Sequence, residues 1–344
     1  MLLLRRARDR MGVRTDTGYT GPVKAAIIGL AGPQLAPEEA RLLRHHAPVG
    51  VILFARNVVS SDQLRGLIGD VRTELPDALL MVDQEGGRVA RLKPPHWRAH
   101  PSAERLARGG ERAAFLSGAL IGVDAAAVGF DVVAAPVLDR RVAGTTAAIG
   151  DRSFGSDAHT VARLGRAQAD GLGAAGVIPV MKHLPGHGAA TVDSHLSLPV
   201  VRDQDEQGDL LPFVLNAGLP WAMTAHILYP AWDNERPATL SSRIIERIIR
   251  GRIGFEGVLV SDDLAMHALS GTPAERAGAT LAAGCDIALY CAGGFDATEA
   301  VLEVCPPLTG SAETRIVLGR DWAAARRLTV DAESLAAERD RLVA

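Results

Sequence analysis

The sequence predicts an α/β fold, a single (β/α)8 barrel of the TIM type with outer helices near the C-terminus. Eight short apolar runs recur along the 344-residue chain, and helix-length segments separate them. The runs are continuously apolar, as expected of strands buried on both faces, and their alternation with helices implies a parallel sheet. Eight such units favour a barrel. A doubly wound open sheet is the alternative, although no Gly-x-Gly-x-x-Gly fingerprint follows the first run.

Turn residues bound each predicted strand, and the segments between strands begin with residues that commonly cap helices. The predicted strands are AAIIGL (25–30), VGVILF (49–54), ALLMVD (78–83), DVVAAPVLD (131–139), VIPVMKH (177–183), WAMTAH (221–226), GVLVSDD (257–263) and DIALYC (286–291). The clearest predicted helices, with apolar residues three or four apart, cover 37–47, 61–75, 156–176 and 241–254.

We expect one domain over residues 21–344 and a flexible N-terminal extension over residues 1–20. The extension has an apolar run of three leucines, and its arginines follow that run, whereas a signal peptide carries its basic residues first. No stretch approaches the ~20 apolar residues of a membrane span. Helices from about residue 311 are expected to pack outside the barrel.

The composition is that of a soluble globular protein, with 47% hydrophobic and 22% charged residues. The net charge is −3 and there is no basic run, so nucleic acid is not an expected partner. Three cysteines without a repeated spacing argue against a disulfide framework or a cysteine zinc site, and a reducing cytoplasm is the simplest location.

Polar residues interrupt the apolar runs repeatedly at the same end. Charged groups at such positions are costly when buried without partners, and catalytic groups of barrels lie at the carboxyl ends of strands. A shared active site is therefore a better interpretation than several unrelated surface residues. The residues concerned are Asp83, Lys182, His183, His226, Asp262 and Asp263.

Two parts of the sequence carry residue types that could bind a metal ion. His183 and His187 are four residues apart, but Pro185 between them breaks the helix that would align their rings, so we expect no metal there and interpret His187 as an ordered loop residue. Magnesium-assisted enolisation would need several carboxylates at strand ends. Asp83, Asp139 and Asp262 or Asp263 leave that alternative open, although capping of the following turn would explain Asp139. His226 is interpreted, like His187, as an ordered residue, and a role at the cavity wall stays open but is not specific.

The segment Asp193-Ser194-His195 lies in a loop rich in glycine and alanine. An aspartate beside an imidazole fixes its tautomer and raises its basicity, so His195 is a candidate general acid and base with Asp193 as partner. The loop composition also suggests that it moves during the reaction cycle. An aspartate and a histidine two residues apart do not by themselves identify a catalytic dyad, because such pairs also occur on ordinary protein surfaces.

Six motifs in fixed order identify a family. They are DQEGGRVARL, APVLD, IGDRSFGSD, KHLPGHGAATVDSH, MTAHILYPAWD and GFEGVLVSDDLAM, and the similarity runs from about residue 50 to residue 291. Together they resemble the bacterial β-N-acetylhexosaminidases of glycoside hydrolase family 3, the NagZ type. Leu184 stands where phenylalanine is common in the family. The resemblance implies a (β/α)8 barrel.

The resemblance also implies site roles. Asp262 matches the nucleophile that forms a covalent glycosyl-enzyme, and His195 with Asp193 matches the acid/base dyad. The implied reaction is hydrolysis of terminal β-linked N-acetylglucosamine with retention, without cofactor or metal. The implied sugar-binding residues are Asp83, Arg91, Arg152, Lys182 and His183.

The expected partner is a small glycan, either a GlcNAc–anhydro-muramoyl peptide from peptidoglycan recycling or a chitooligosaccharide. We expect a monomer or weak dimer. Two other functions stay open. A phosphorylase is conceivable because a histidine acid/base carries no permanent negative charge to repel phosphate. A sugar-binding protein without turnover is the third alternative, against which the intact nucleophile and dyad argue.

Overall fold

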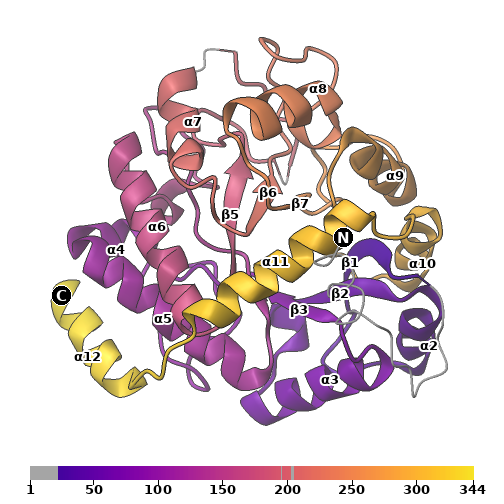
Figure 1. Cartoon of the computed structure of the whole chain (residues 1–344), viewed down its shortest axis with the longest axis horizontal. Coiled ribbons are helices and arrows are strands. Elements are labelled where there is room, and N and C mark those ends of the chain that lie inside the picture. Colours follow the sequence, from indigo (N-terminus) through magenta and orange to yellow (C-terminus); the bar gives the residue numbers. More distant parts are fainter. Residues whose placement is uncertain (1–21, 195, 203–204) are drawn as a thin grey trace.

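A closed parallel barrel forms the centre of the protein (Figure 1). The computed structural model describes residues 22–194, 196–202 and 205–344. The strands pair in the order β7-β6-β5-β4-β3-β2-β1-β8, and a parallel bridge between Val260 and Ile287 joins the two ends of that order. The strands are β1 (Lys24–Gly29), β2 (Pro48–Leu53), β3 (Leu79–Val82), β4 (Val132–Val133), β5 (Ile178–Leu184), β6 (Trp221–Thr224), β7 (Val258–Val260) and β8 (Ala288–Tyr290).

Helices surround this barrel and connect successive strands (Figure 1). They are α2 (Pro37–His46), α3 (Ser61–Glu74), α4 (Ala103–Arg108), α5 (Gly110–Val128), α6 (Ala158–Ala174), α7 (Glu206–Val214), α8 (Ser242–Ile244), α9 (Pro273–Ala283), α10 (Phe295–Val304), α11 (Gly310–Arg326) and α12 (Ala332–Leu342). The predicted barrel and its eight strands are confirmed. The predicted extension over residues 1–20 lies outside the described residues.

Two elements differ from the sequence prediction. The run predicted as a strand over 131–139 forms a regular ladder only at Val132–Val133, because Pro136 has no N–H to donate, and Val137 then resumes as a bridge to Lys182. The helix predicted over 241–254 begins as α8 and continues as a π-helix, Ile245–Arg252. Apolar spacing marks the buried face of that segment but does not distinguish the two hydrogen-bond patterns.

Helix α11 closes the amino-terminal end of the barrel. In Figure 1 it runs across the front of the strands, and its Ala312, Ile316 and Ala323 are buried in the same apolar cluster as the inward-facing strand residues. The Leu308 amide, just before α11, donates to the Val23 carbonyl at the start of β1. The opposite, carboxyl-terminal end of the barrel is therefore the end where a cavity can open.

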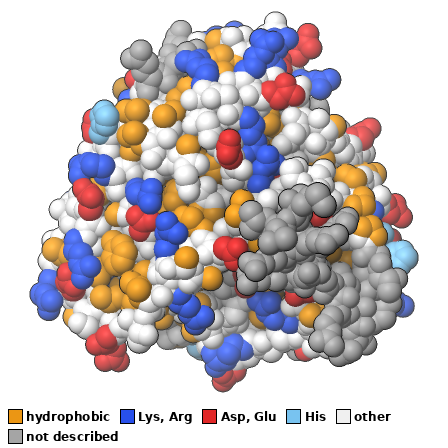
Figure 2. All heavy atoms as spheres, in the orientation of Figure 1, with side chains coloured by type: hydrophobic (Ala, Val, Ile, Leu, Met, Phe, Trp, Pro, Cys, Tyr) orange, Lys and Arg blue, Asp and Glu red, His pale blue; other side chains and the backbone are white. Residues whose placement is uncertain are grey.

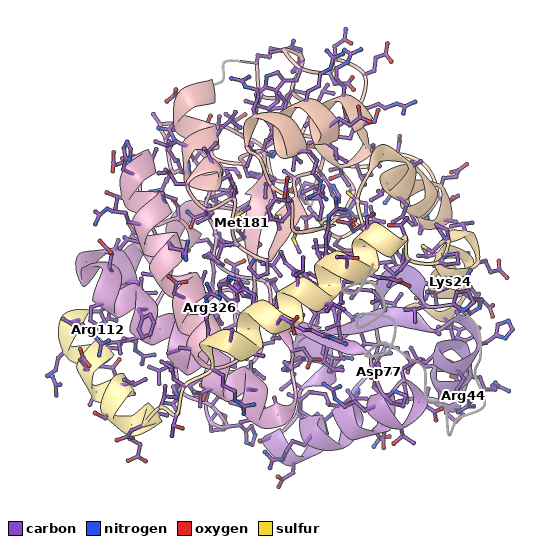
Figure 3. The ribbon with its side chains drawn as sticks, in the orientation of Figure 1. Lys24, Arg44, Asp77, Arg112, Met181 and Arg326 are labelled. Carbon is purple, nitrogen blue, oxygen red and sulfur yellow. The ribbon has the colours of Figure 1, made fainter. Side chains whose placement is uncertain are left out.

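The last helix packs on the outer layer. Figure 3 shows Arg112 of α5 beside α12, and both Nε and Nη2 of Arg112 donate to Glu338, at 2.7 and 2.8 Å. Acidic and basic side chains are interspersed on the face that carries α11 (Figure 2). Among the helices of the described ranges, none is long and apolar enough to cross a membrane.

Candidate active site

A cavity of about 280 Å³ opens at the carboxyl-terminal end of the barrel. Its apolar lining comes from side chains that point into the barrel near this end. They include Ile52, Ala134, Met223, Leu289 and Cys291. Its polar lining includes most of the residues predicted from the sequence. These are Asp83, Arg91, Arg152, Lys182, His183, Asp193 and Asp262. Of the strand-end residues expected to converge, Asp83, Lys182, His183, Asp262 and Asp263 line the cavity, whereas His226 does not.

Four of these residues form one ionic cluster around a residue that the sequence analysis did not single out. Lys182 Nζ lies 2.6 Å from Asp83 Oδ1 and 2.6 Å from Glu85 Oε1. Arg152 donates to both oxygens of Glu85 at 2.8 Å, and Arg91 Nη2 donates to Asp83 at 2.9 Å. Burial raises the pKa of Glu85, but the charges of Arg152 and Lys182 outweigh it and hold the pKa far below its ordinary value.

The cluster fixes long cationic side chains in place. A free lysine or arginine would lose considerable rotamer entropy on binding a ligand, whereas here that entropy is lost during folding. Lys182 is almost fully buried, yet the pKa of its amine is raised, because Asp83 and Glu85 outweigh the effect of burial. The ammonium group is therefore charged and pre-oriented beside the cavity.

His183 is oriented by a buried carboxylate. Its Nδ1 donates to Asp139 Oδ2 at 2.6 Å, which leaves Nε2 to face Arg152 Nη2 at 3.5 Å. The other oxygen of Asp139 accepts the backbone N–H of His187 at 2.6 Å. Asp139 was interpreted as a cap of the turn after its strand, but its carboxylate instead joins β5 to the loop that follows it.

Asp262 and Asp263 have different surroundings although they are adjacent. Burial raises the pKa of Asp262, but His183 and His226 outweigh it, so the net pKa is lowered and the group is ionised at neutral pH. Asp263 Oδ1 accepts the backbone N–H groups of Ala265 and Cys291, and burial raises its pKa. Both residues line the cavity, but Asp263 ties β7 to β8, whereas Asp262 is a charged carboxylate.

His226 is an internal residue. Its ring is fully buried, with Nδ1 2.8 Å from Thr239 Oγ1 and Nε2 donating to the Asp263 carbonyl at 3.0 Å. Both ring nitrogens have partners inside the protein, and the ring does not line the cavity. These contacts are those of an ordered internal residue, and the expected convergence of His226 on the cavity with the other strand-end residues is not observed.

The loop after β5 carries the predicted dyad. Asp193 and Ser194 line the cavity, as does His187, whose Nε2 lies 3.3 Å from Ser194 Oγ. His195, the predicted acid/base, lies outside the described residues. Within the described parts of the chain, no group of three His, Cys, Asp or Glu side chains is placed to hold a metal ion.

Sequence reasoning missed Glu85 and underrated Asp139. Glu85 lies two residues after Asp83 in the motif DQEGGRVARL, so its position near the cavity could have been inferred. Phe54 at the end of β2 was also not singled out. It lines the cavity, with the guanidinium groups of Arg56 and Arg91 5.1 and 5.4 Å from its ring centroid.

Comparisons with known proteins agree with this geometry. Residues 22–314 match the family model described as the glycosyl hydrolase family 3 N-terminal domain. A Beta-hexosaminidase of Methylococcus capsulatus is 41% identical over 295 residues, 83% of this chain and 87% of that protein. A Beta-hexosaminidase of Pseudomonas aeruginosa is 41% identical over 279 residues, 77% of this chain and 81% of that protein.

Solved structures show the same architecture. The crystal structure of NagZ from Neisseria gonorrhoeae in complex with N-trifluoroacetyl-D-glucosamine superposes with a TM-score of 0.83. It is 32% identical, and the match covers 94% of this chain and 99% of that chain. The native enzyme from the same organism gives a TM-score of 0.82 at 33% identity, covering 94% and 98% of the two chains.

Proposed function

Because the chain belongs to glycosyl hydrolase family 3, we propose that this glycoside hydrolase is a retaining exo-β-N-acetylglucosaminidase. The observation that carries the proposal is the ionised Asp262 in a cavity beside the fixed cations Lys182 and Arg152. The relatives named Beta-hexosaminidase and the neighbour bound to an N-acylated glucosamine support the choice of sugar.

In the proposed mechanism, Asp262 attacks the anomeric carbon of the bound sugar. A new bond forms between its carboxylate oxygen and that carbon while the bond to the leaving oxygen breaks. His195 gives its proton to the leaving oxygen, and Asp193 stabilises the imidazolium before transfer. Water then attacks the glycosyl-enzyme, His195 takes the proton from that water, and Asp262 is released as a carboxylate.

We propose that the ionic cluster holds the sugar hydroxyl groups. Lys182, Arg91 and Arg152 are donors and Asp83 is an acceptor, a set that suits the charge-assisted hydrogen bonds made to sugars. His183 completes the set through Nε2. The cavity of about 280 Å³ lies at the small end of ligand sites and therefore suits one terminal sugar more than an extended chain.

The cellular setting is also a proposal. The similarity to the NagZ type favours GlcNAc–anhydro-muramoyl peptides in peptidoglycan recycling, with chitooligosaccharides as the alternative substrate. We propose that residues 21–344 act as one catalytic domain in the cytoplasm, as a monomer or weak dimer. Cys285, Cys291 and Cys305 are all free and buried, which suits a reducing compartment.

The first experiment is 4-nitrophenol release from 4-nitrophenyl N-acetyl-β-glucosaminide in phosphate-free buffer, with wild type and Asp262→Asn. Turnover by wild type that is lost in the variant supports both the hydrolase and its nucleophile. Turnover that survives in the variant contradicts the assignment of Asp262. No turnover by either protein favours a phosphorylase, which added phosphate would reveal as a sugar 1-phosphate, or a binding protein.

A further inference from the structure

The loop after β5 begins with a firmly held turn. Tyr229 Oη donates to the Gly186 carbonyl at 2.6 Å, and the His187 N–H donates to Asp139 at 2.6 Å. Thr145 Oγ1 donates to the Gly188 carbonyl at 2.6 Å, and a Cβ on Gly188 would lie 2.1 Å from the Arg140 carbonyl oxygen. These contacts therefore hold the first turn of the loop against the barrel.

Farther along, the buried residue Ser194 lies between exposed apolar residues of the loop. Val192 and Leu196 have 41% and 75% of their surfaces exposed, whereas Ser194 is 3% exposed. The buried hydroxyl of Ser194 lies opposite the imidazole of His187, 3.3 Å from Nε2. His187 thus connects the held turn to the segment that contains Asp193.

His187 also contacts the sugar-binding side of the cavity. Its ring packs edge-on against the His183 ring, with centroids 5.7 Å apart, and both histidines bond to Asp139. Burial lowers the pKa of His187 to about 4, so the ring is neutral at pH 7. Its Nδ1 has no hydrogen-bond partner, so the ring contacts the loop at Ser194 through Nε2.

We propose that His187 is a positioning residue for the acid/base step, because its contact with Ser194 fixes the segment that carries Asp193. This inference rests on the proposed function, in which Asp193 and His195 move the proton. It replaces the interpretation of His187 as an ordered loop residue without a role in the reaction. His187 acts through Ser194 and needs no contact with the reacting atoms.

The test compares kcat/KM for two N-acetyl-β-glucosaminides that differ in leaving group. Phenol is a poor leaving group that needs protonation, whereas 2,4-dinitrophenolate leaves without it, so a defect in acid catalysis affects the phenyl substrate selectively. We expect Ser194→Ala to lower kcat/KM about tenfold for the phenyl substrate and less than about twofold for the dinitrophenyl substrate, as for one lost hydrogen bond. Ser194→Thr, which keeps the hydroxyl, should resemble wild type.

Two further variants test the same contact from each side. His187→Asn should reproduce the selectivity, because the shorter amide does not reach the position of Nε2, and combining it with Ser194→Ala should add little. Ser197→Ala is the matched control, since Ser197 is an exposed serine of the same loop. Thermal melting of each variant, with wild-type melting expected for Ser194→Ala, separates a local change from loss of the fold.

Asp193→Ala serves as the reference for the proposed function. If Asp193→Ala is selective for the phenyl substrate and Ser194→Ala is not, the inference about His187 is wrong and the dyad assignment stands. An equal loss on both substrates in Ser194→Ala would likewise overturn the inference, because it would indicate a general distortion of the cavity. If Asp193→Ala itself shows no selectivity, the dyad assignment fails and the inference falls with it.

Discussion

Asp139 accepts a hydrogen bond from His183 Nδ1 at 2.6 Å while both groups are almost fully buried. Burial raises the pKa of Asp139, but His183 outweighs it, so the carboxyl stays ionised. The same carboxylate accepts the His187 N–H, so one charge orients the His183 ring, which is proposed to bind the sugar, and holds the start of the loop that contains the proposed dyad.

Replacing Asp139 with Asn should therefore impair catalysis, even though the substitution changes none of the residues proposed to contact the sugar. Hydrogen bonds to charged groups contribute about 1.5–3 kcal/mol, so we expect kcat/KM for the 4-nitrophenyl substrate to fall about 10- to 100-fold. Asp62→Asn, at a carboxylate that is 90% exposed on α3, should leave kcat/KM unchanged. Wild-type kinetics in Asp139→Asn would show that the His183 ring does not depend on this charge.

Glu85→Gln should destabilise the fold as well as the site. The substitution leaves Lys182 and Arg152 buried with less compensating charge, and breaking a buried pair costs about 3–5 kcal/mol. Urea unfolding measures the free energy of unfolding. The control is Glu104→Gln, whose ion pair with Arg141 is about 40% exposed on both sides and should contribute less than about 1 kcal/mol. Equal losses in the two variants would contradict the central role of Glu85.

The stability of the protein should depend on pH through His187. Its pKa is lowered to about 4 in the folded state, whereas an unfolded histidine titrates near about 6.5. Between these values the unfolded chain binds the extra proton, so stability is fully present above pH ~6.5 and is lost as pH falls toward 4. The free energy of unfolding should rise with pH more steeply in wild type than in His187→Asn, by up to about 1.4 kcal/mol per pH unit. Parallel curves would exclude this contribution.

The helix that closes the barrel should contribute strongly to stability. Ile316 on α11 is 1% exposed and packs against the inward-facing strand residues, so Ile316→Ala should cost about 2–5 kcal/mol. Leu318 on the same helix is 60% exposed, and Leu318→Ala should change stability by less than about 0.5 kcal/mol. Urea unfolding of both variants checks the contrast, and a small loss in Ile316→Ala would mean that α11 is dispensable for the core.

The barrel and the convergence of its strand-end residues were predictable because parallel strands direct their carboxyl ends to one edge. Lys182 and Asp83 are 99 residues apart in the chain, yet both follow from that rule. The pairing of Glu85 with Arg152, 67 residues away, was not predictable, since neither lies in a strand and loop geometry decides their contact. The spacing of apolar residues also failed to predict the early end of β4 before Pro136 and the π-helix at Ile245–Arg252. At both places backbone hydrogen bonding, rather than hydrophobicity, determines the structure.

Helix α11 has a consequence for the order of events during turnover. Because it packs into one end of the barrel, we expect the cavity, as far as the described residues define it, to open at the other end alone, so that whatever enters leaves by the same mouth. In the proposed mechanism the leaving group would occupy the outer part of that passage, so it would depart before water reaches the glycosyl-enzyme. The sugar proposed to bind in the cavity would lie deepest and depart last. We therefore expect N-acetylglucosamine to act as a competitive product inhibitor, whereas the first product should not compete with substrate for the empty site.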